Sequence, residues 1–514
     1  MNPRQIYLIL YLTLFSLSFV LARQSDPKLK EIDDYILKVQ KDWNVPGCGV
    51  AIVKDDSVIF EKGFGVREIG KPEPVDQNTL FGIASCSKAF TAASIAMLVD
   101  EGKIKWDDPV TKYLPDFQLY DPYVTREMQV RDLLCHRSGL TTFGGDLIWY
   151  WTKYDRKEVI RRIRYLKPTS SFRTQFGYQN IMFLTAGMII PAVTGKNWED
   201  FVKERIFAPL GMANSNTSIS SFKPGDDVAT PHNEHEGKLR VVKWMPGDNL
   251  GPAGAINSSA HDMAQWMRLQ LGRGTYRGNK LFSAGVSRTM WTIHTPQQIG
   301  EQSARLVPST HFSGYGLGWG LRDYEGRMLV DHTGAVDGMT SRILLVPDEK
   351  LGVVVLTNSE SPFSSIITRK VVDVFIGVTK MEWNTLNLLQ KHAGDSLSAA
   401  AEKKIEDSRI KGTKPSLALE KYSGTYSSEM YGDVSVTVEN KNLVVTFNAT
   451  QDLIADLEHW HYDTFRATVR PMNYPFGKGF VQFILDKDAN VTELKVDIPN
   501  PDFDFKELEL KKGR

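Results

Sequence analysis

The sequence predicts an α+β fold, in which both ends of one large domain build an antiparallel sheet and a small all-β domain follows. Three observations support this prediction. Two β-rich runs lie near the start, in "CGVAIVKDDSVIFEKGFGVRE" at 48–68. Three more lie in "MLVDHTGAVDGMTSRILLVPDEKLGVVVLTN" at 328–358. The stretch between them is helical or loop-rich, and short strand-like runs recur at regular spacing after residue 416.

Residues 1–22 predict a secretory signal peptide. One arginine precedes an almost unbroken apolar stretch from Ile6 to Leu21, and Val20 and Ala22 are small enough for a signal peptidase. An uncleaved membrane anchor is the alternative, although the run is short for a span. The mature chain is therefore expected to be secreted (extracellular, or periplasmic in a bacterium), with no stable membrane insertion. If the source glycosylates secreted proteins, four sequons are available, at Asn216, Asn257, Asn448 and Asn490.

Residues 23–380 are expected to form the first domain. It begins with a helix near residue 29, continues with a hairpin that turns at 54–56, and reaches a long helix that follows Ser85 and ends at Gly102. One face of that helix is expected to carry small apolar residues, namely Ala89, Ala92, Ala93, Ala96 and Met97. A helical subdomain occupies 107 to about 300, and the strands at 328–358 complete the sheet.

Residues 381–415 are polar and helix-prone, and predict a partly helical linker. Residues 416–514 predict a second, all-β domain. Apolar and polar residues alternate in "DVSVTVENKNLVVTFN" at 433–448, with a turn at 439–442, and the pattern repeats in "GFVQFILDKDANVTELKVDI" at 479–498. Several short strands at regular spacing are typical of a small barrel or sandwich.

Composition excludes some classes of partner. Of the 514 residues 42% are hydrophobic and 24% are charged, as in a globular chain, and the formal net charge is +1. Because the chain has no dense Lys/Arg tract, nucleic acids and acidic membrane surfaces are not expected as partners. Three cysteines, Cys48, Cys86 and Cys135, are too few for a disulfide framework, so buried thiols are expected.

The first candidate for chemistry is "SCSK", in which Ser85 lies three residues before Lys88 where a helix begins. A serine hydroxyl is a poor nucleophile unless another group takes its proton. A lysine one helical turn away can reach the serine oxygen, and it accepts a proton if burial keeps it partly neutral. Taken alone, the motif is explained equally well by a serine that caps the helix.

Two further motifs follow along the chain. In "SFRTQFGYQN", Tyr178 can shuttle a proton and Asn180 can bind a substrate carbonyl, although a packed aromatic beside a turn-forming asparagine explains them as well. In "DHTGAVDG", Gly334 lets a ligand approach the strand backbone, and an N–H just past it can face an oxyanion. The alternative there is a simple strand kink.

In this order, the three motifs resemble those of the serine β-lactamase and penicillin-binding-protein superfamily. The resemblance points to the branch of class C β-lactamases, D-alanyl-D-alanine carboxypeptidases and related esterases (peptidase S12-like). It covers roughly 30–360 and extends to "VRDLLCHRSGLTT", "GPAGAINSSAHDMAQWM" and "YGLGWGL". It implies a β-lactamase-like antiparallel sheet flanked by helices. The all-β tail resembles the lipocalin-like domain that some members carry.

The resemblance also implies roles for individual residues. Ser85 would be the acylated nucleophile, and Lys88 and Tyr178 would share the general acid and base work. The oxyanion hole would be the backbone N–H groups of Ser85 and Ala335. No metal or organic cofactor is expected. The residues that would contact the substrate are Asn180, His332, Thr333, Gly334 and Ala335.

One position departs from the best-known lactamase pattern. Many lactamases have lysine before Thr-Gly, whereas this chain has His332, which is mostly neutral at pH 7. This weakens the case for an efficient β-lactamase, although His-Thr-Gly also occurs among carboxypeptidases and aminopeptidases of the family. Arg322 or Arg342 is a candidate for the missing charge.

Three other features have simpler explanations. His232 and His235 in "PHNEHEG" are expected to lie in a solvated loop rather than to bind a metal. His136 and Ser138 in "CHRSGL" are expected to form a structural turn bordering the site. Trp319 is either core or a wall of the substrate cleft.

The sequence therefore predicts a secreted serine hydrolase that cleaves an amide or ester through an acyl-enzyme at Ser85 (peptidase, β-lactamase or esterase type). The substrate would be a small molecule or a peptide. The alternative is a non-enzymatic extracellular matrix or binding protein that retains the hydrolase fold. Formation of a homo-oligomer stays open.

Overall fold

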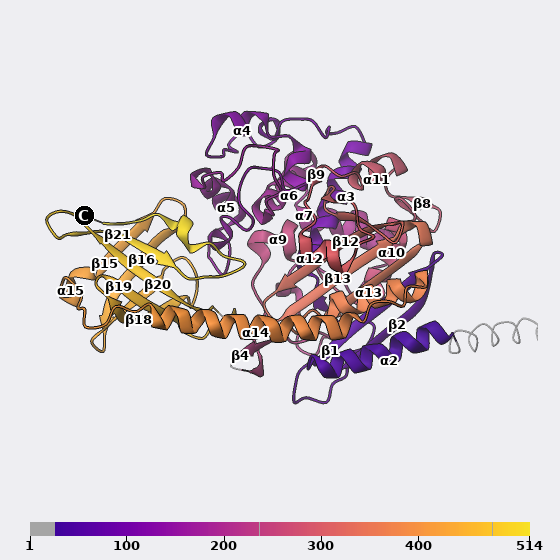
Figure 1. The fold of residues 1–514 in the computed structure, drawn as a ribbon. Helices are drawn as coiled ribbons and strands as arrows, with labels where there is room; N and C mark the ends of the chain where they lie inside the picture. Colours follow the sequence, from indigo (N-terminus) through magenta and orange to yellow (C-terminus); the bar gives the residue numbers. More distant parts are fainter. Residues whose placement is uncertain (1–25, 236, 475, 514) are drawn as a thin grey trace, which may run out of the picture.

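The computed structural model describes residues 26–235, 237–474 and 476–513. The predicted signal peptide at 1–22 lies outside the described residues. The chain forms a large sheet-and-helix domain and a separate barrel, joined by one long helix that runs along both (Figure 1). Within the described ranges, no helix is both long and apolar enough to cross a bilayer.

An eight-stranded antiparallel sheet forms the centre of the first domain. Its strand order is β2-β1-β14-β13-β12-β11-β10-β9. The N-terminal hairpin joins the C-terminal strands directly, because Cys48 pairs with Thr357. This confirms that both ends of the domain build the sheet. The strand bounds are β1 Gly47–Lys54, β2 Ser57–Gly65, β9 Thr295–Pro296, β10 Ser313–Tyr315, β11 Gly320–Tyr324, β12 Arg327–Val336, β13 Met339–Val346 and β14 Leu351–Thr357.

The first hairpin turns where the sequence predicted. Asp55 and Asp56 have φ angles of 49° and 59°, the left-handed region that a two-residue hairpin loop requires. Aspartate tolerates this region better than most residues.

Helices cover both faces of the sheet. Helices α2 (Pro27–Asp42) and α13 (Phe363–Ile376) pack on one face, and α10 (Ala260–Leu271) packs on the other. The helical region between β2 and β9 surrounds α3 (Ser87–Asp100). Other helices are α4 Pro122–Glu127, α5 Arg156–Arg162, α6 Asn180–Thr194, α7 Trp198–Val202, α8 Ala208–Leu210, α9 Gly251–Gly254, α11 Ala284–Met290 and α12 Glu301–Leu306.

Helix α3 corrects one expectation. Every residue from Ser87 to Leu98 is buried, so the helix is enclosed on all sides rather than packed through one face. It contacts α6, α9 and α11 at once. Its small residues serve this close packing, and the alanine stripe is one part of a fully buried surface.

The segment predicted as a partly helical linker contains α14 (Trp383–Asp407), a helix of 25 residues. Its first turn is fixed to the large domain, where the Trp383 indole N–H donates to Asp373 at 2.7 Å. Near its other end, Arg466 of the barrel donates to both carboxylate oxygens of Glu402 at 2.7 Å. Helix α14 (orange in Figure 1) therefore connects to both domains through side-chain contacts.

The C-terminal domain is a closed antiparallel barrel of eight strands, which confirms the predicted small all-β barrel. Its core is aromatic and aliphatic, with Tyr426, Val434, Phe447, Phe465 and Phe483 buried. A particular likeness to lipocalins stays a prediction. The elements are α15 Leu419–Tyr422 and β15 Gly424–Ser428, β16 Gly432–Glu439, β17 Asn442–Phe447, β18 Ile454–His461, β19 Thr464–Val469, β20 Lys478–Leu485, β21 Val491–Asp497 and β22 Leu510–Lys512.

The barrel rests on the helical part of the first domain. Glu507 accepts a hydrogen bond from the backbone N–H of Gly145 at 2.8 Å, and Tyr154 donates to the carbonyl of Tyr431 at 2.9 Å. Three short two-stranded pairs complete the fold. They are β3 Phe81–Gly82 with β6 Asn257–Ser258, β4 His232–His235 with β5 Lys238–Val241, and β7 Thr275–Tyr276 with β8 Asn279–Lys280.

Several sequence expectations are resolved by burial. Cys48, Cys86 and Cys135 are free, buried thiols, as predicted. Trp319 is fully buried core. His232 is not in a solvated loop: it is buried, and its ring nitrogens bond the Asn358 carbonyl and the Ile69 N–H because β4 packs beside both segments. Of the sequons, Asn448 and Asn490 are exposed, whereas Asn257 is buried.

Candidate active site

Ser85 lies in a short 3₁₀ turn, Ala84–Cys86, that leads directly into α3. Ala84, the residue before it, has a φ of 46°, which places a residue with a side chain in the left-handed region. Such conformations cost about 1–3 kcal/mol and concentrate at functional sites. The turn presents Ser85 to a cavity while its neighbours Ala84 and Cys86 stay buried.

Lys88 lies one helical turn after Ser85 and is completely buried. Its ammonium nitrogen Nζ is 3.0 Å from Ser85 Oγ, 2.7 Å from Asn180 Oδ1 and 2.9 Å from the carbonyl oxygen of Ala253. Burial lowers the pKa of Lys88 to about 7, and the nearby Asp146 carboxylate only partly offsets this effect. A large neutral fraction therefore exists near neutral pH, and neutral Lys88 can accept the Ser85 proton.

Asn180 is the first residue of α6 and links Lys88 to a buried acid. Its amide nitrogen donates to Asp146 Oδ2 at 2.6 Å, and the Trp149 indole donates to Asp146 Oδ1 at 2.8 Å. Burial raises the pKa of Asp146 to about 7. Sequence reasoning missed Asp146, whose single signal is an acid within the apolar run "GGDLIWYW".

Tyr178 precedes α6 and stacks on His136, with ring centroids 4.1 Å apart. The N–H of Gln179 donates to His136 Nδ1 at 2.9 Å, so this histidine holds the turn that carries Tyr178. Lys88 Nζ lies 4.9 Å from the Tyr178 ring centroid. Burial raises the pKa of Tyr178 far above its usual value, and a hydrogen bond with Ser85 opposes the shift. Tyr178 therefore stays a protonated phenol at neutral pH.

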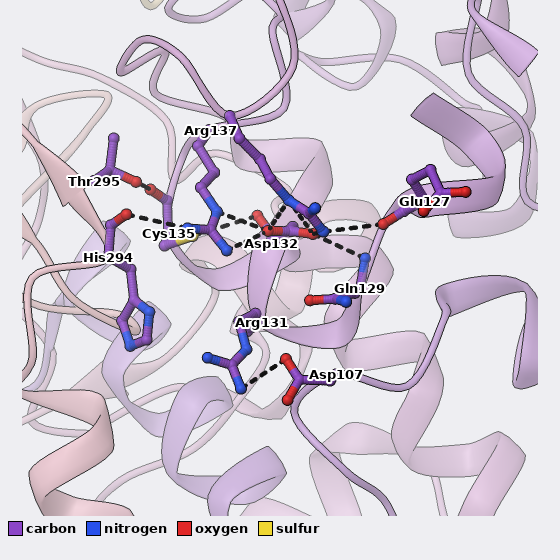
Figure 2. A network of polar contacts seen from close by, with 10 residues as sticks. Asp107, Glu127, Gln129, Arg131, Asp132, Cys135, Arg137, His294 and Thr295 are labelled. Carbon is purple, nitrogen blue, oxygen red and sulfur yellow. Dashed lines mark hydrogen bonds and ion pairs between the residues drawn. The ribbon is translucent and has the colours of Figure 1, made fainter. Parts of the chain in front are cut away.

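A buried ion cluster fixes the segment that bears His136 (Figure 2). Asp132 is fully buried and accepts from Arg137 Nε at 2.7 Å, from Gln129 N at 2.9 Å and from Arg173 Nη2 at 2.6 Å. Arg137 also donates to the carbonyl of His294 at 3.2 Å. Arg173 belongs to the loop before Tyr178. The Asp132 carboxylate therefore links this loop to the segment that bears His136, whose ring stacks on Tyr178.

Strand β12 forms the opposite wall of the site. It pairs with β11 only as far as Asp331, so the half from 332 to 336 has β13 on one side and no strand of the described residues on the other. Thr333 and Ala335 are exposed on this half and line the cavity. His332 and Gly334 alternate with them and are buried. A Cβ on Gly334 would lie 2.2 Å from the Ile83 carbonyl oxygen, so the glycine is what lets β12 approach the turn of Ser85.

The structure places His332 behind the strand rather than in the cavity. Its Nε2 bonds the Tyr315 hydroxyl at 2.7 Å. Burial and the charge of Lys88 lower the pKa of His332 to about 4, so the ring is neutral. Arg322 and Arg342 both pair with Asp331 and do not line the cavity.

The cavity in front of Ser85 has a volume of about 510 Å³. It brings together Ser85, Tyr178, Asn180, Thr333 and Ala335 of the predicted site, and Lys88 lies beneath it. Its remaining lining comes from Phe143, Asp146, Trp149, Tyr150, Met245, Val336, Asp337, Thr340, Glu360, Tyr474, Asp502 and Phe503. The last three belong to the barrel domain, a contribution that sequence reasoning did not find.

The arrangement of His, Cys, Asp and Glu side chains shows whether the protein could bind a metal ion. Across residues 26–235, 237–474 and 476–513, no three His, Cys, Asp or Glu side chains are grouped so that they could hold a metal ion. The chemistry that this arrangement can perform is nucleophilic attack by Ser85, with Lys88 and Tyr178 available to move protons.

Comparison with known families agrees with this geometry. The Beta-lactamase family profile matches residues 32–374, which is most of the chain. The chain belongs to the Beta-lactamase family. A second profile, a domain of unknown function (DUF3471), matches residues 408–512 and so covers the barrel.

Relatives of this Beta-lactamase family member include named hydrolases. An unguisins hydrolase of Aspergillus campestris (strain IBT 28561) is 28% identical over 446 residues, which are 82% of this chain and 80% of that protein. Protein flp of Staphylococcus aureus (strain COL) is 27% identical over 344 residues, which are 66% of this chain and 65% of that protein.

Solved structures share the fold. The octameric penicillin-binding protein homologue from Pyrococcus abyssi has a TM-score of 0.62 and 22% identity, and the match covers 94% of this chain and all of that chain. The D-amino acid amidase from Ochrobactrum anthropi SV3 has a TM-score of 0.55 and 24% identity, and covers 68% of this chain and 98% of that one. At these identities the likeness concerns the fold alone.

Proposed function

We propose that this protein is a secreted serine hydrolase that cleaves an amide or ester bond through an acyl-enzyme on Ser85. The observation that carries the proposal is the 3.0 Å contact between Ser85 Oγ and the buried Lys88 Nζ. A lysine whose pKa burial lowers to about 7 is the group that this serine needs. The unguisins hydrolase relative supports a hydrolytic activity.

In the acylation step, neutral Lys88 accepts the Ser85 proton as Oγ attacks the substrate carbonyl carbon. The backbone N–H groups of Ser85 and Ala335 stabilise the oxyanion. When the tetrahedral intermediate collapses, the bond to the leaving group breaks, and the Tyr178 phenol relays a proton from Lys88 to that group. Water then attacks the acyl carbon and gives one proton to the same residues, which releases the acid and restores Ser85.

The residues that line the cavity limit the class of substrate that it can bind. None of its residues is Lys, Arg or His, as far as the structure describes the chain. A β-lactam or carboxypeptidase substrate presents a carboxylate, and this cavity offers no fixed cation to bind one. The surroundings instead favour an amide or ester whose group near β12 is neutral or cationic.

The test is intact-protein mass spectrometry after incubation with a fluorophosphonate probe and, separately, with a penicillin. We expect the fluorophosphonate adduct on the wild type and its loss in Ser85→Ala. Ser138→Ala is the matched control, because Ser138 is a buried serine beside His136, and it should label normally. The penicillin is expected to leave little adduct.

Mass spectrometry also tests the alternative function and the predicted signal peptide. If the folded wild type formed no adduct, the result would favour the alternative of a non-enzymatic matrix or binding protein that retains the hydrolase fold. The mass of protein collected from a secreting host also tests the signal peptide, because cleavage after Ala22 leaves a chain that begins at Arg23.

A further inference from the structure

Three carboxylates line one part of the cavity, its acidic end, and they lie close enough together for the charges of Asp337 and Asp502 to act on Glu360. Asp337 lies in the turn after β12, Glu360 follows β14, and Asp502 comes from the barrel loop after β21. Glu360 stands at the rim, where it is exposed and accepts from the Gly338 N–H at 2.7 Å. Two domains therefore supply negative charge to one end of the substrate cavity.

Among the described residues, the hydrogen-bond donors to these carboxylates are all neutral. Asp337, 4% exposed, accepts from the Tyr150 hydroxyl at 3.0 Å and the Trp151 indole at 2.9 Å. Asp502 accepts from the Tyr474 hydroxyl at 2.7 Å. In the described part of the chain none of the three forms an ion pair. Partial burial raises the pKa of Glu360, and the charges of Asp337 and Asp502 raise it further, as expected for like charges without a counterion.

Aromatic rings surround the same end of the cavity. The Tyr150 and Phe503 ring centroids are 4.6 Å apart, and those of Tyr474 and Phe503 are 5.5 Å apart. Carboxylates combined with aromatic faces are the surroundings in which an organic cation binds well. A metal ion does not fit, because the acidic side chains of the described residues are not grouped closely enough to hold one.

We propose that this end of the cavity, lined by Asp337, Glu360 and Asp502, binds a protonated amine on the acyl part of the substrate. The inference rests on the proposed function, because it assigns the substrate class of the Ser85 site. Asp337 follows Ala335 by two residues and lies in the turn that ends β12, so the amine binds past the end of the strand that carries the oxyanion donor.

The test compares p-nitrophenyl hexanoate with p-nitrophenyl 6-aminohexanoate, which differ in the terminal ammonium group. The readout is the ratio of kcat/KM for the amino ester to that for the plain ester. We expect the wild type to favour the amino ester, and Glu360→Gln/Asp502→Asn to lower the ratio at least about tenfold through KM. The single variant Glu360→Gln, at the exposed rim, should show part of this effect.

The matched control is Glu420→Gln/Asp488→Asn, which removes two exposed barrel carboxylates outside the cavity and gives the same net charge. It should keep the wild-type ratio. Raising the ionic strength should lower the wild-type ratio and leave that of the cavity variant nearly unchanged. An equal ratio in the wild type and the cavity variant would overturn the proposal, and so would a wild type that prefers the plain ester.

A binding experiment separates this proposal from the hydrolase proposal. Calorimetry with 6-aminohexanamide on Ser85→Ala should give binding that weakens at least about tenfold when Glu360→Gln/Asp502→Asn is added. Carboxylate-dependent binding without fluorophosphonate labelling of the wild type would retain the amine site and reject the hydrolase. Labelling and ester turnover without carboxylate dependence would retain the hydrolase and reject the amine site.

Discussion

The low pKa of Lys88 depends on the residues that surround it and not on the Ser-x-x-Lys motif alone. The side chain is enclosed by α6 and α9, which supply the Asn180 oxygen and the Ala253 carbonyl. Both groups hold the amine in place, while the lack of solvent lowers its pKa to about 7. The same Ser-x-x-Lys spacing on an exposed helix would leave the lysine charged and the serine inert.

The reaction rate is expected to depend on pH through Lys88. In the proposed mechanism the neutral form of Lys88 is the base, so kcat/KM should rise with pH, with an apparent midpoint near 7. The Asp146 carboxylate favours protonated Lys88, so Asp146→Asn should move that midpoint to lower pH. The measurement is a pH–rate profile with an ester substrate. Asp200→Asn, an exposed carboxylate on α7, is the control; an unmoved midpoint in Asp146→Asn would contradict the assignment of Lys88 as the base.

Residue patterns could predict part of the site. The motifs identified Ser85, Lys88, Tyr178 and Asn180, which the structure brings around one point. They could not identify Asp146, because a lone acid in an apolar run carries no spacing signal. They also could not show that His332 faces inward, since that depends on which face of β12 is covered.

At the scale of elements, helices α6 and α9 pack against each other at Gly187. A Cβ on Gly187 of α6 would lie 2.2 Å from Pro252 Cγ. The carbonyl of Pro252 accepts from Thr91 at 2.6 Å, and the next carbonyl, of Ala253, accepts from Lys88. Close packing at Gly187 therefore sets the position of the backbone carbonyl that accepts from Lys88.

Replacing this glycine should affect both stability and activity. We expect Gly187→Ala to cost about 1–3 kcal/mol in the free energy of unfolding, because the added methyl overpacks the contact. Displacement of α9 should also lower kcat. Urea denaturation and ester kinetics measure the two effects.

The control is Gly394→Ala in α14, where nothing lies within 4 Å of the added Cβ. That substitution should stabilise by about 0.5–1 kcal/mol, because alanine is the better residue inside an exposed helix. If Gly187→Ala proved as well tolerated as Gly394→Ala, the packing argument would fail.

Elements were predictable where pattern and turn chemistry agree. The hairpin at Asp55 and Asp56 and the alternation of 433–448 appear in the structure as β1–β2 and β16–β17. Helix α3 was misread in part, because a helix buried on all sides has no polar face to define its orientation. The barrel residues that reach the cavity lie in loops, where sequence gives no contact partner.

At the scale of the whole molecule, the barrel forms part of the cavity in front of Ser85. Tyr474, Asp502 and Phe503 line the cavity, and Glu507 bonds the loop that precedes Asp146. The contact at Glu507 is partly buried, and burial raises the pKa of this carboxyl group to about 8. The junction between the domains therefore contains a carboxyl group that is protonated at neutral pH.

This group makes stability depend on pH. The folded protein holds the Glu507 proton up to a pKa of about 8, whereas the unfolded chain releases it near the ordinary value of 4.5. The folded state thus binds more protons in that window, and its contribution to stability falls as pH rises from about 5 to about 8. Glu507→Gln should make the fall shallower, by about 1–3 kcal/mol over the window.

Urea titrations at about pH 5 and about pH 8 measure the effect. Glu509→Gln is the matched control, because Glu509 is exposed and pairs with Lys167. It should leave the difference between the two pH values as in the wild type. An identical difference in Glu507→Gln would show that this carboxyl does not titrate as proposed.

The pairing of β1 with β14 has a consequence for biosynthesis. Cys48 and Thr357 are neighbours in the sheet but lie 309 residues apart in the chain. At a ribosomal rate of about 5–20 residues per second, β1 is made roughly 15–60 s before its partner. During that interval the hairpin of β1 and β2 has no strand paired with the outer edge of β1. Until β14 emerges, the nascent chain therefore exposes one edge of β1, and an N-terminal fragment that ends before β14 lacks the strand that joins β1 to β13.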